Sequence, residues 1–140
     1  MQFAYHPDQD IFTARWVTSH ALQTERAEYE AILLAPEGLG TPYWLLDVRR
    51  RPTTDADAAS WVTTNWLPRA AAQHRPARLR LAFLVAPVRA ENLRADLALR
   101  AVMDAAYAPG NLFDLRTFTD EDAARSWLQG LLDKPTEVAG

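Results

Sequence analysis

The chain contains no cysteine, which excludes disulfides, thiolate metal sites and cysteine nucleophiles. It also has only one lysine, Lys134, because fourteen of its fifteen basic residues are arginine. The formal net charge of −3 argues against a protein that binds nucleic acid or a membrane surface by electrostatic attraction. The absence of cysteine is compatible with a reducing compartment.

Long apolar segments and targeting signals are also absent from the sequence. No segment approaches the roughly 18 apolar residues of a membrane span. The first eight residues, Met1–Asp8, lack the basic and apolar regions of a signal peptide. We therefore expect a cytoplasmic protein that has no membrane partner.

The common catalytic and nucleotide-binding motifs are missing as well. The sequence has no GxGxxG, GxxxxGK[ST], HExxH or GxSxG pattern. Its serines and histidines are far apart and occur in helix or turn contexts: Ser19, Ser60, Ser126, His6, His20 and His74. We expect no enzyme, no cofactor and no metal site, although a histidine and a carboxylate could still converge in three dimensions.

The residues that are present indicate one α/β domain. At 140 residues, with 49% hydrophobic and 24% charged residues, the chain is long enough to bury a core. Phe3–Tyr5 and Ile11–Val17 are β-prone segments separated by a polar spacer, which predicts a hairpin. In the second strand, the face that carries Phe12, Ala14 and Trp16 is expected to meet the core.

After an amphipathic helix over Ser19–Ala35, the sequence alternates between strands and helices. The order is ββαβαβαβα, which predicts a mixed, mostly parallel five-stranded sheet with about four helices. Residues 1–133 would form the domain and 134–140 a flexible tail. The last three strands are expected at Tyr43–Val48, Leu79–Ala86 (interior) and Leu112–Phe118 (nearer an edge). The helices are expected from Thr54, over Arg89–Tyr107 and after a cap signal at Thr119–Asp122, whose acids suit a helix N-terminus.

The helix after Tyr43–Val48 carries three further predictions. Thr54 and Asp57 have the spacing of a capping box. Pro68 is expected to kink or split the helix, because proline lacks the N–H that the helical turn requires. Trp61 lies on the apolar stripe and is expected in the core, as is Trp127 in the last helix, whereas Trp66 is a candidate to line an opening.

The best candidate site is the end of the Tyr43–Val48 strand. Open α/β sheets usually bind their ligands at the edge where the parallel strands end. One interpretation is that its basic run binds an anion or an acidic partner, aided by free N–H groups of the next helix. The other is a solvated surface run in which Asp47 pairs with an arginine. The candidate binding residues are Asp47, Arg49, Arg50, Arg51, Thr53 and Thr54.

Three phrases of the chain resemble the SpoIIAA-like branch of the STAS superfamily. They are Tyr43–Asp47, Leu81–Val85 and Phe118–Leu128. The resemblance covers roughly residues 2–132 and implies a mixed sheet with helices largely on one side. It also implies non-enzymatic binding of a partner protein, a nucleotide or an apolar ligand. In anti-anti-sigma members of this family, a phosphorylatable Ser or Thr begins the helix that follows an Asp-bearing strand. Thr53 and Thr54 occupy the corresponding position in this chain. The Asp-Ser-Ser-Gly signature of those members is absent from this sequence.

We therefore predict a non-catalytic binding or regulatory module for a protein partner or a small anionic ligand, without a nucleic-acid role. One alternative is a carrier of an apolar small molecule between a helix and the sheet. The other is a small enzyme with spatially convergent acid–base groups. A closed core with a charged rim would favour the binding module, and a deep apolar cavity would favour the carrier. A cleft that gathers titratable groups with perturbed pKa values would favour the enzyme.

Overall fold

The computed structural model describes residues 1–17, 22–51 and 54–130, with the backbone alone for residues 22–24. The predicted tail at 134–140 lies outside the described residues, as do Thr53, Ser19 and His20.

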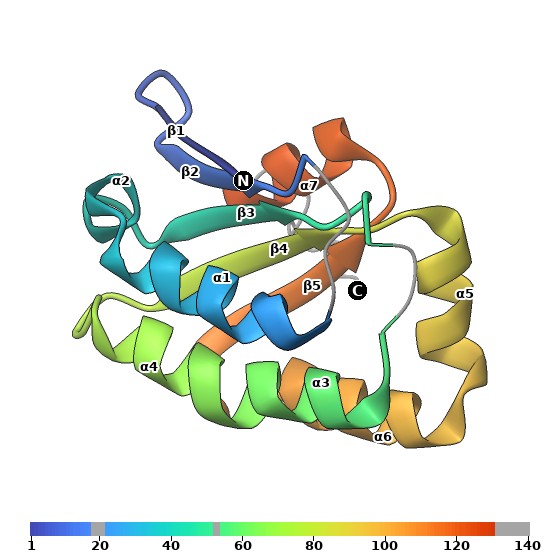
Figure 1. The fold of residues 1–140 in the computed structure, drawn as a ribbon. Helices are drawn as coiled ribbons and strands as arrows, with labels where there is room; N and C mark the ends of the chain where they lie inside the picture. Colours follow the sequence, from blue (N-terminus) through green and yellow to red (C-terminus); the bar gives the residue numbers. More distant parts are fainter. Residues whose placement is uncertain (18–21, 52–53, 131–140) are drawn as a thin grey trace.

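The strands form one mixed sheet in the order β1-β2-β3-β4-β5 (Figure 1). β1 and β2 pair antiparallel as the predicted hairpin, and all other neighbours pair parallel. The prediction of a five-stranded, mostly parallel mixed sheet is confirmed, with β4 interior and β5 at an edge. The strands are β1 (Gln2–His6), β2 (Ile11–Arg15), β3 (Tyr43–Asp47), β4 (Leu79–Leu84) and β5 (Phe113–Phe118).

Over the described residues the helices form six separate segments, more than the four or so expected. Pro36 opens an additional short helix, and Asp96 divides the predicted Arg89–Tyr107 helix in two. The Asp96 carboxylate accepts a hydrogen bond from the Leu99 N–H at 3.1 Å, so it caps a new helix. The helices are α1 (Leu22–Leu34), α2 (Pro36–Leu39), α3 (Ala56–Trp61) continuing through η1 (Val62–Trp66) into α4 (Leu67–Ala72), α5 (Pro87–Ala95), α6 (Leu97–Tyr107) and α7 (Glu121–Leu128).

Pro68 changes the winding of its helix without ending it. The five residues before α4 form a π-helical segment, in which the Leu67 N–H bonds to the Val62 carbonyl. The wider π turn accommodates a proline ring that would clash with the carbonyl four residues earlier in a regular α-helix. The helix therefore runs from Ala56 to Ala72 with an altered register.

Aspartates cap the helices that follow β3 and β5. Asp55 accepts from the Ala58 N–H at 2.8 Å, so α3 begins at Ala56 and the predicted Thr54–Asp57 capping box is wrong. Asp120 accepts from the Ala123 N–H at 2.8 Å, which confirms the predicted cap of α7.

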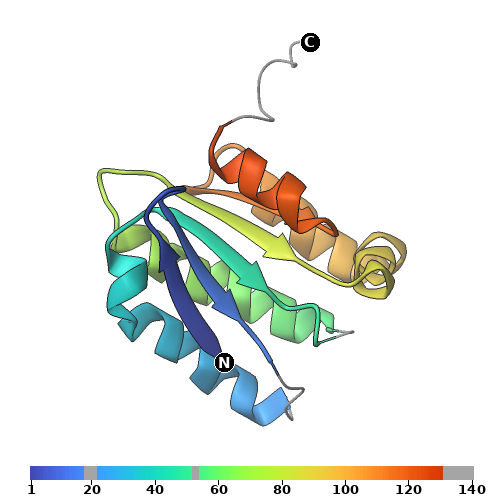
Figure 2. The ribbon, with the colours of Figure 1, turned by 90° about the horizontal axis from the view of Figure 1, so that it is seen from above.

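Two apolar layers enclose the sheet. α1, the α3–α4 helix and α6 cover one face, and α7 covers the other (Figures 1 and 2). Phe12, Ala14 and Trp16 lie in the larger core, as predicted, whereas Ile11 packs with Trp127 under α7. None of the helices in the described parts of the chain is long and apolar enough to cross a membrane.

The tryptophans are core residues. Trp66 has 0% exposure, and its indole N–H donates to the Tyr29 carbonyl at 2.8 Å, so the prediction that it lines an opening is wrong. Trp127 is 3% exposed and Trp61 is partly buried against the core, as expected.

Candidate functional site

Four parallel strands end at one edge of the sheet, and α5 lies beyond their ends (Figures 1 and 2). The connections from β3 to α3, from β4 to α5 and from β5 to α7 all leave from this carboxyl edge. It is the edge at which open α/β sheets usually bind ligands.

Asp47, the last residue of β3, lies at the centre of an ionic network. Its carboxylate accepts from the Arg49 guanidinium at 2.7 and 3.0 Å and from the Arg15 guanidinium. Burial raises the pKa of Asp47, but the hydrogen bonds from the side chain and backbone of Arg49 outweigh it, so this pKa lies below its ordinary value. Asp47 is therefore paired, as one of the two interpretations anticipated.

Glu121, in the first turn of α7, joins the network from the other face of the sheet. It accepts from Arg15 at 3.2 Å, from Arg49 at 3.3 Å and from Arg125 at 2.9 Å. The hydrogen bond from Arg15, with a further one from Arg125, lowers the pKa of Glu121 to about 2 against the opposing effect of burial. The network thus ties β2, β3 and α7 together.

Arg51 is buried, contrary to the expectation of an exposed basic run. Its side chain is only 5% exposed, and its guanidinium donates to Glu28 of α1 at 2.5 Å. Glu28 also accepts from the Trp16 indole N–H at 3.0 Å. The Arg51 carbonyl accepts from Arg89 of α5 at 3.1 Å. Arg51 therefore links the segment after β3 to α1 through its side chain and to α5 through its carbonyl.

The other predicted residues separate into surface and interior groups. Arg50 is exposed, and Arg49 keeps 42% of its side chain accessible while it contacts Asp47 and Glu121. Thr54 is partly buried and faces inward, and Thr53 lies outside the described residues. The three adjacent arginines therefore do not present one common surface.

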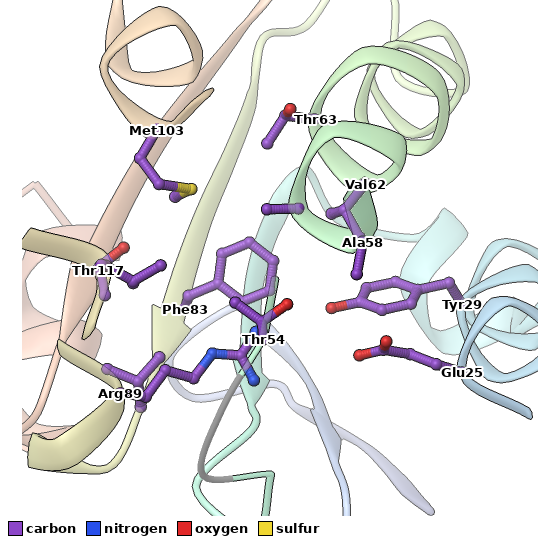
Figure 3. Close-up of a pocket in the computed structure, with 13 residues that line it drawn as sticks. Glu25, Tyr29, Thr54, Ala58, Val62, Thr63, Phe83, Arg89, Met103 and Thr117 are labelled. Carbon is purple, nitrogen blue, oxygen red and sulfur yellow. The ribbon is translucent and has the colours of Figure 1, made fainter. Parts of the chain in front are cut away.

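A small pocket lies between the helices and the sheet beside this edge (Figure 3). Its volume is about 30 Å³, room for one or two water molecules. Phe83, Val62 and Met103 are among the apolar residues that line it (Figure 3). Thr54 contributes from the connection after β3, so one predicted site residue belongs to this pocket.

Three polar side chains that the sequence analysis missed also line the pocket: Glu25, Tyr29 and Arg89. They are 7%, 1% and 7% exposed. Burial raises the pKa of Tyr29 and lowers the pKa of Arg89. The four-residue spacing of Glu25 and Tyr29 on α1 was the available signal, because residues at i and i+4 share a helix face.

Neither of the two described histidines lies at this edge, and His6 pairs with Ile11 at the start of β2. His74 follows α4 and contacts the Trp44 ring at 5.4 Å, and burial lowers its pKa. His20 lies outside the described residues. Within the parts of the chain that the structure describes, no group of three or more His, Asp or Glu side chains could hold a metal ion.

No protein-family model, curated protein or solved structure matches this chain.

Proposed function

We propose that the protein is a non-catalytic binding module that recognises an acidic protein partner or a small anionic ligand at the carboxyl edge of its sheet. The observation that carries the proposal is the gathering of charged side chains from β2, β3 and α7 around Asp47 at this edge. Arg49 and Arg50 form its accessible cationic rim. Guanidinium groups suit carboxylates and phosphates because they donate two parallel hydrogen bonds.

The internal contacts of the network favour recognition over chemistry. Asp47 and Glu121 each accept hydrogen bonds from arginines that hold them ionised. A carboxylate with a depressed pKa is a poor general base at neutral pH. Such a network positions Arg49 and leaves its remaining donors and those of Arg50 for a partner.

The resemblance to SpoIIAA-like STAS domains supports the same proposal. A mixed sheet with most of its helices on one face is the architecture which that resemblance implies. A carrier that encloses a whole apolar molecule has less support, because ligand pockets usually measure about 300–1,000 Å³ and this pocket about 30 Å³.

A photo-crosslinking amino acid at position 50, introduced in the native host, tests the protein-binding proposal. Its matched control is the same amino acid at position 39, because Leu39 is also exposed but lies at the opposite end of β3. We expect a discrete adduct with an acidic protein from position 50 alone, weakened by Arg49→Ala and by salt.

A titration with inorganic phosphate, followed by amide chemical shifts, tests the small-anion form of the proposal. We expect shifts at residues 49–51 that Arg50→Glu suppresses and Arg94→Glu does not, since Arg94 is also exposed but lies on α5. If position 50 gives no specific adduct and phosphate causes no localised shifts, the proposal is wrong.

A further inference from the structure

The helix–sheet pocket brings together three polar groups that are each more than nine-tenths buried. The Glu25 carboxylate and the Tyr29 hydroxyl come from α1, and the Arg89 guanidinium from the first turn of α5. In Figure 3 all three side chains extend toward the middle of the pocket, with Phe83 behind them. Two helices that are far apart in the sequence, α1 and α5, therefore direct a carboxylate, a hydroxyl and a guanidinium into the same pocket.

These groups do not satisfy one another. Arg89 donates from Nη1 to the Arg51 carbonyl, but its buried Nε has no hydrogen-bond partner among the described residues. In the same part of the chain, Glu25 and Arg89 interact electrostatically without a direct ion pair, and the Trp66 indole N–H donates to the Tyr29 carbonyl rather than to its hydroxyl. Buried polar groups in proteins are nearly always hydrogen-bonded, so this constellation is suited to a further polar partner beyond the described residues.

The pocket around these three polar groups adjoins a larger groove, and the two together limit the shape of a ligand. The pocket itself holds about 30 Å³, but Leu93, Met103 and Thr117 also line a groove of about 500 Å³ between α5 and α6. These three side chains therefore form the partition between the two spaces. Met103 is the most adaptable of them, because it is unbranched and has three rotatable bonds.

We propose that this pocket binds the head of a neutral amphipathic molecule, a group such as a primary amide that both donates and accepts hydrogen bonds. The amide N–H₂ donates to Glu25 and the amide oxygen accepts from Arg89 and Tyr29. A slender apolar tail passes Met103 into the groove between α5 and α6. This inference goes beyond the proposed surface function and does not depend on it.

The charges of the pocket explain the preference for a neutral head. A carboxylate head would meet the buried Glu25, and an ammonium head would meet the buried Arg89. In a poorly solvated space each of these like-charge contacts is strongly unfavourable. A neutral donor–acceptor head can hydrogen-bond to both side chains and places no like charge beside either of them.

Three probes of equal chain length test the proposal: hexanamide, hexanoate and hexylammonium. Binding to the full chain is followed by calorimetry and by chemical shifts of the Met103 methyl group. We expect hexanamide to bind at least tenfold more tightly than either charged probe, and Arg50→Glu to leave its affinity unchanged.

Two variants make the test specific to the pocket. Glu25→Gln removes the negative charge, so the preference for hexanamide over hexanoate should fall at least fivefold, a change that a merely structural role would not produce. Met103→Ala should strengthen hexanamide binding about fivefold by widening the partition. Its matched control is Val102→Ala, the adjacent α6 residue, which lines neither space and should leave the affinity unchanged.

Equal affinity for the three probes, or a selectivity that Glu25→Gln does not alter, would overturn the proposal. So would the absence of any binding to both the wild-type chain and Met103→Ala, because the pocket would then take water alone.

Discussion

Neighbouring arginines at the end of β3 have different physical roles. Arg50 is exposed, whereas the Arg51 guanidinium is buried between Glu28 and the Trp16 ring, 5.9 Å from the ring centroid. Removing one partner of a buried ion pair leaves the other charge without compensation, which is more costly than the loss of an exposed pair.

We therefore predict that Arg51→Ala lowers the free energy of unfolding by about 2–4 kcal/mol. The control is Arg50→Ala, which should change that free energy by less than about 0.5 kcal/mol. Urea denaturation followed by tryptophan fluorescence measures both variants. Equal stability of the two would mean that the Arg51–Glu28 pair contributes nothing in solution.

At the scale of elements, the short helix α2 owes its position to a glycine. A Cβ atom on Gly38 would lie 3.1 Å from the Phe12 ring and 3.1 Å from the Trp44 ring. Both rings have 0% exposure, and the Trp44 indole N–H is held by the carbonyls of Gly38 and Thr41 at 3.0 and 2.8 Å. Neither ring can shift without disturbing the core.

Gly38→Ala is accordingly expected to destabilise the fold by about 1–3 kcal/mol through overpacking between α2 and the sheet. Gly110→Ala is the matched control, because a Cβ there would meet nothing within 4 Å. It should be neutral or slightly stabilising, since alanine restricts the unfolded chain more than glycine. Thermal unfolding of the two variants provides the comparison, and a neutral Gly38→Ala would show that α2 moves freely.

The π-helical segment and the Asp96 cap illustrate why element boundaries differ from a sequence pattern. Pro68 is accommodated by a local change in helical winding, and Asp96 caps a helix within a continuous apolar stripe. Both outcomes depend on backbone geometry that the spacing of apolar residues does not specify.

At the scale of the whole molecule, ion pairs join α7 to the sheet at its carboxyl edge. Glu121 of α7 lies on one side of the sheet and contacts Arg15, the last residue of β2, and Arg49, which follows β3. Its pKa of about 2 is below the roughly 4.3 of an unfolded glutamate. The stabilisation is therefore present above about pH 4.3 and is lost as the pH falls toward 2.

We predict that Glu121→Gln is less stable than the wild-type chain at pH 7 and that this difference disappears by about pH 2. Urea midpoints at pH 7, 4 and 2 measure the convergence. Glu91→Gln is the control, because Glu91 and Arg94 form an exposed pair on one helix and should contribute little at any pH. A constant difference between Glu121→Gln and wild type would contradict the proposed ionic origin.

The sequence by itself determined the sheet and much of its core. Alternation of short apolar runs with amphipathic segments predicted five strands, the hairpin and the interior place of β4. Two-residue periodicity also assigned Phe12, Ala14 and Trp16 to the larger core. These features follow from local pattern, since a strand must direct alternate side chains to opposite faces.

Only the tertiary structure decided which charged residues share a site. Arg15 and Glu121 are separated by 106 positions yet form an ion pair, and Arg15 also pairs with Asp47. Arg51 becomes buried because α1 supplies Glu28. Glu25 and Arg89 reach one pocket from helices on opposite sides of β3 in the sequence. Burial and pairing of a charge depend on neighbours that the folded chain provides, which no local periodicity encodes.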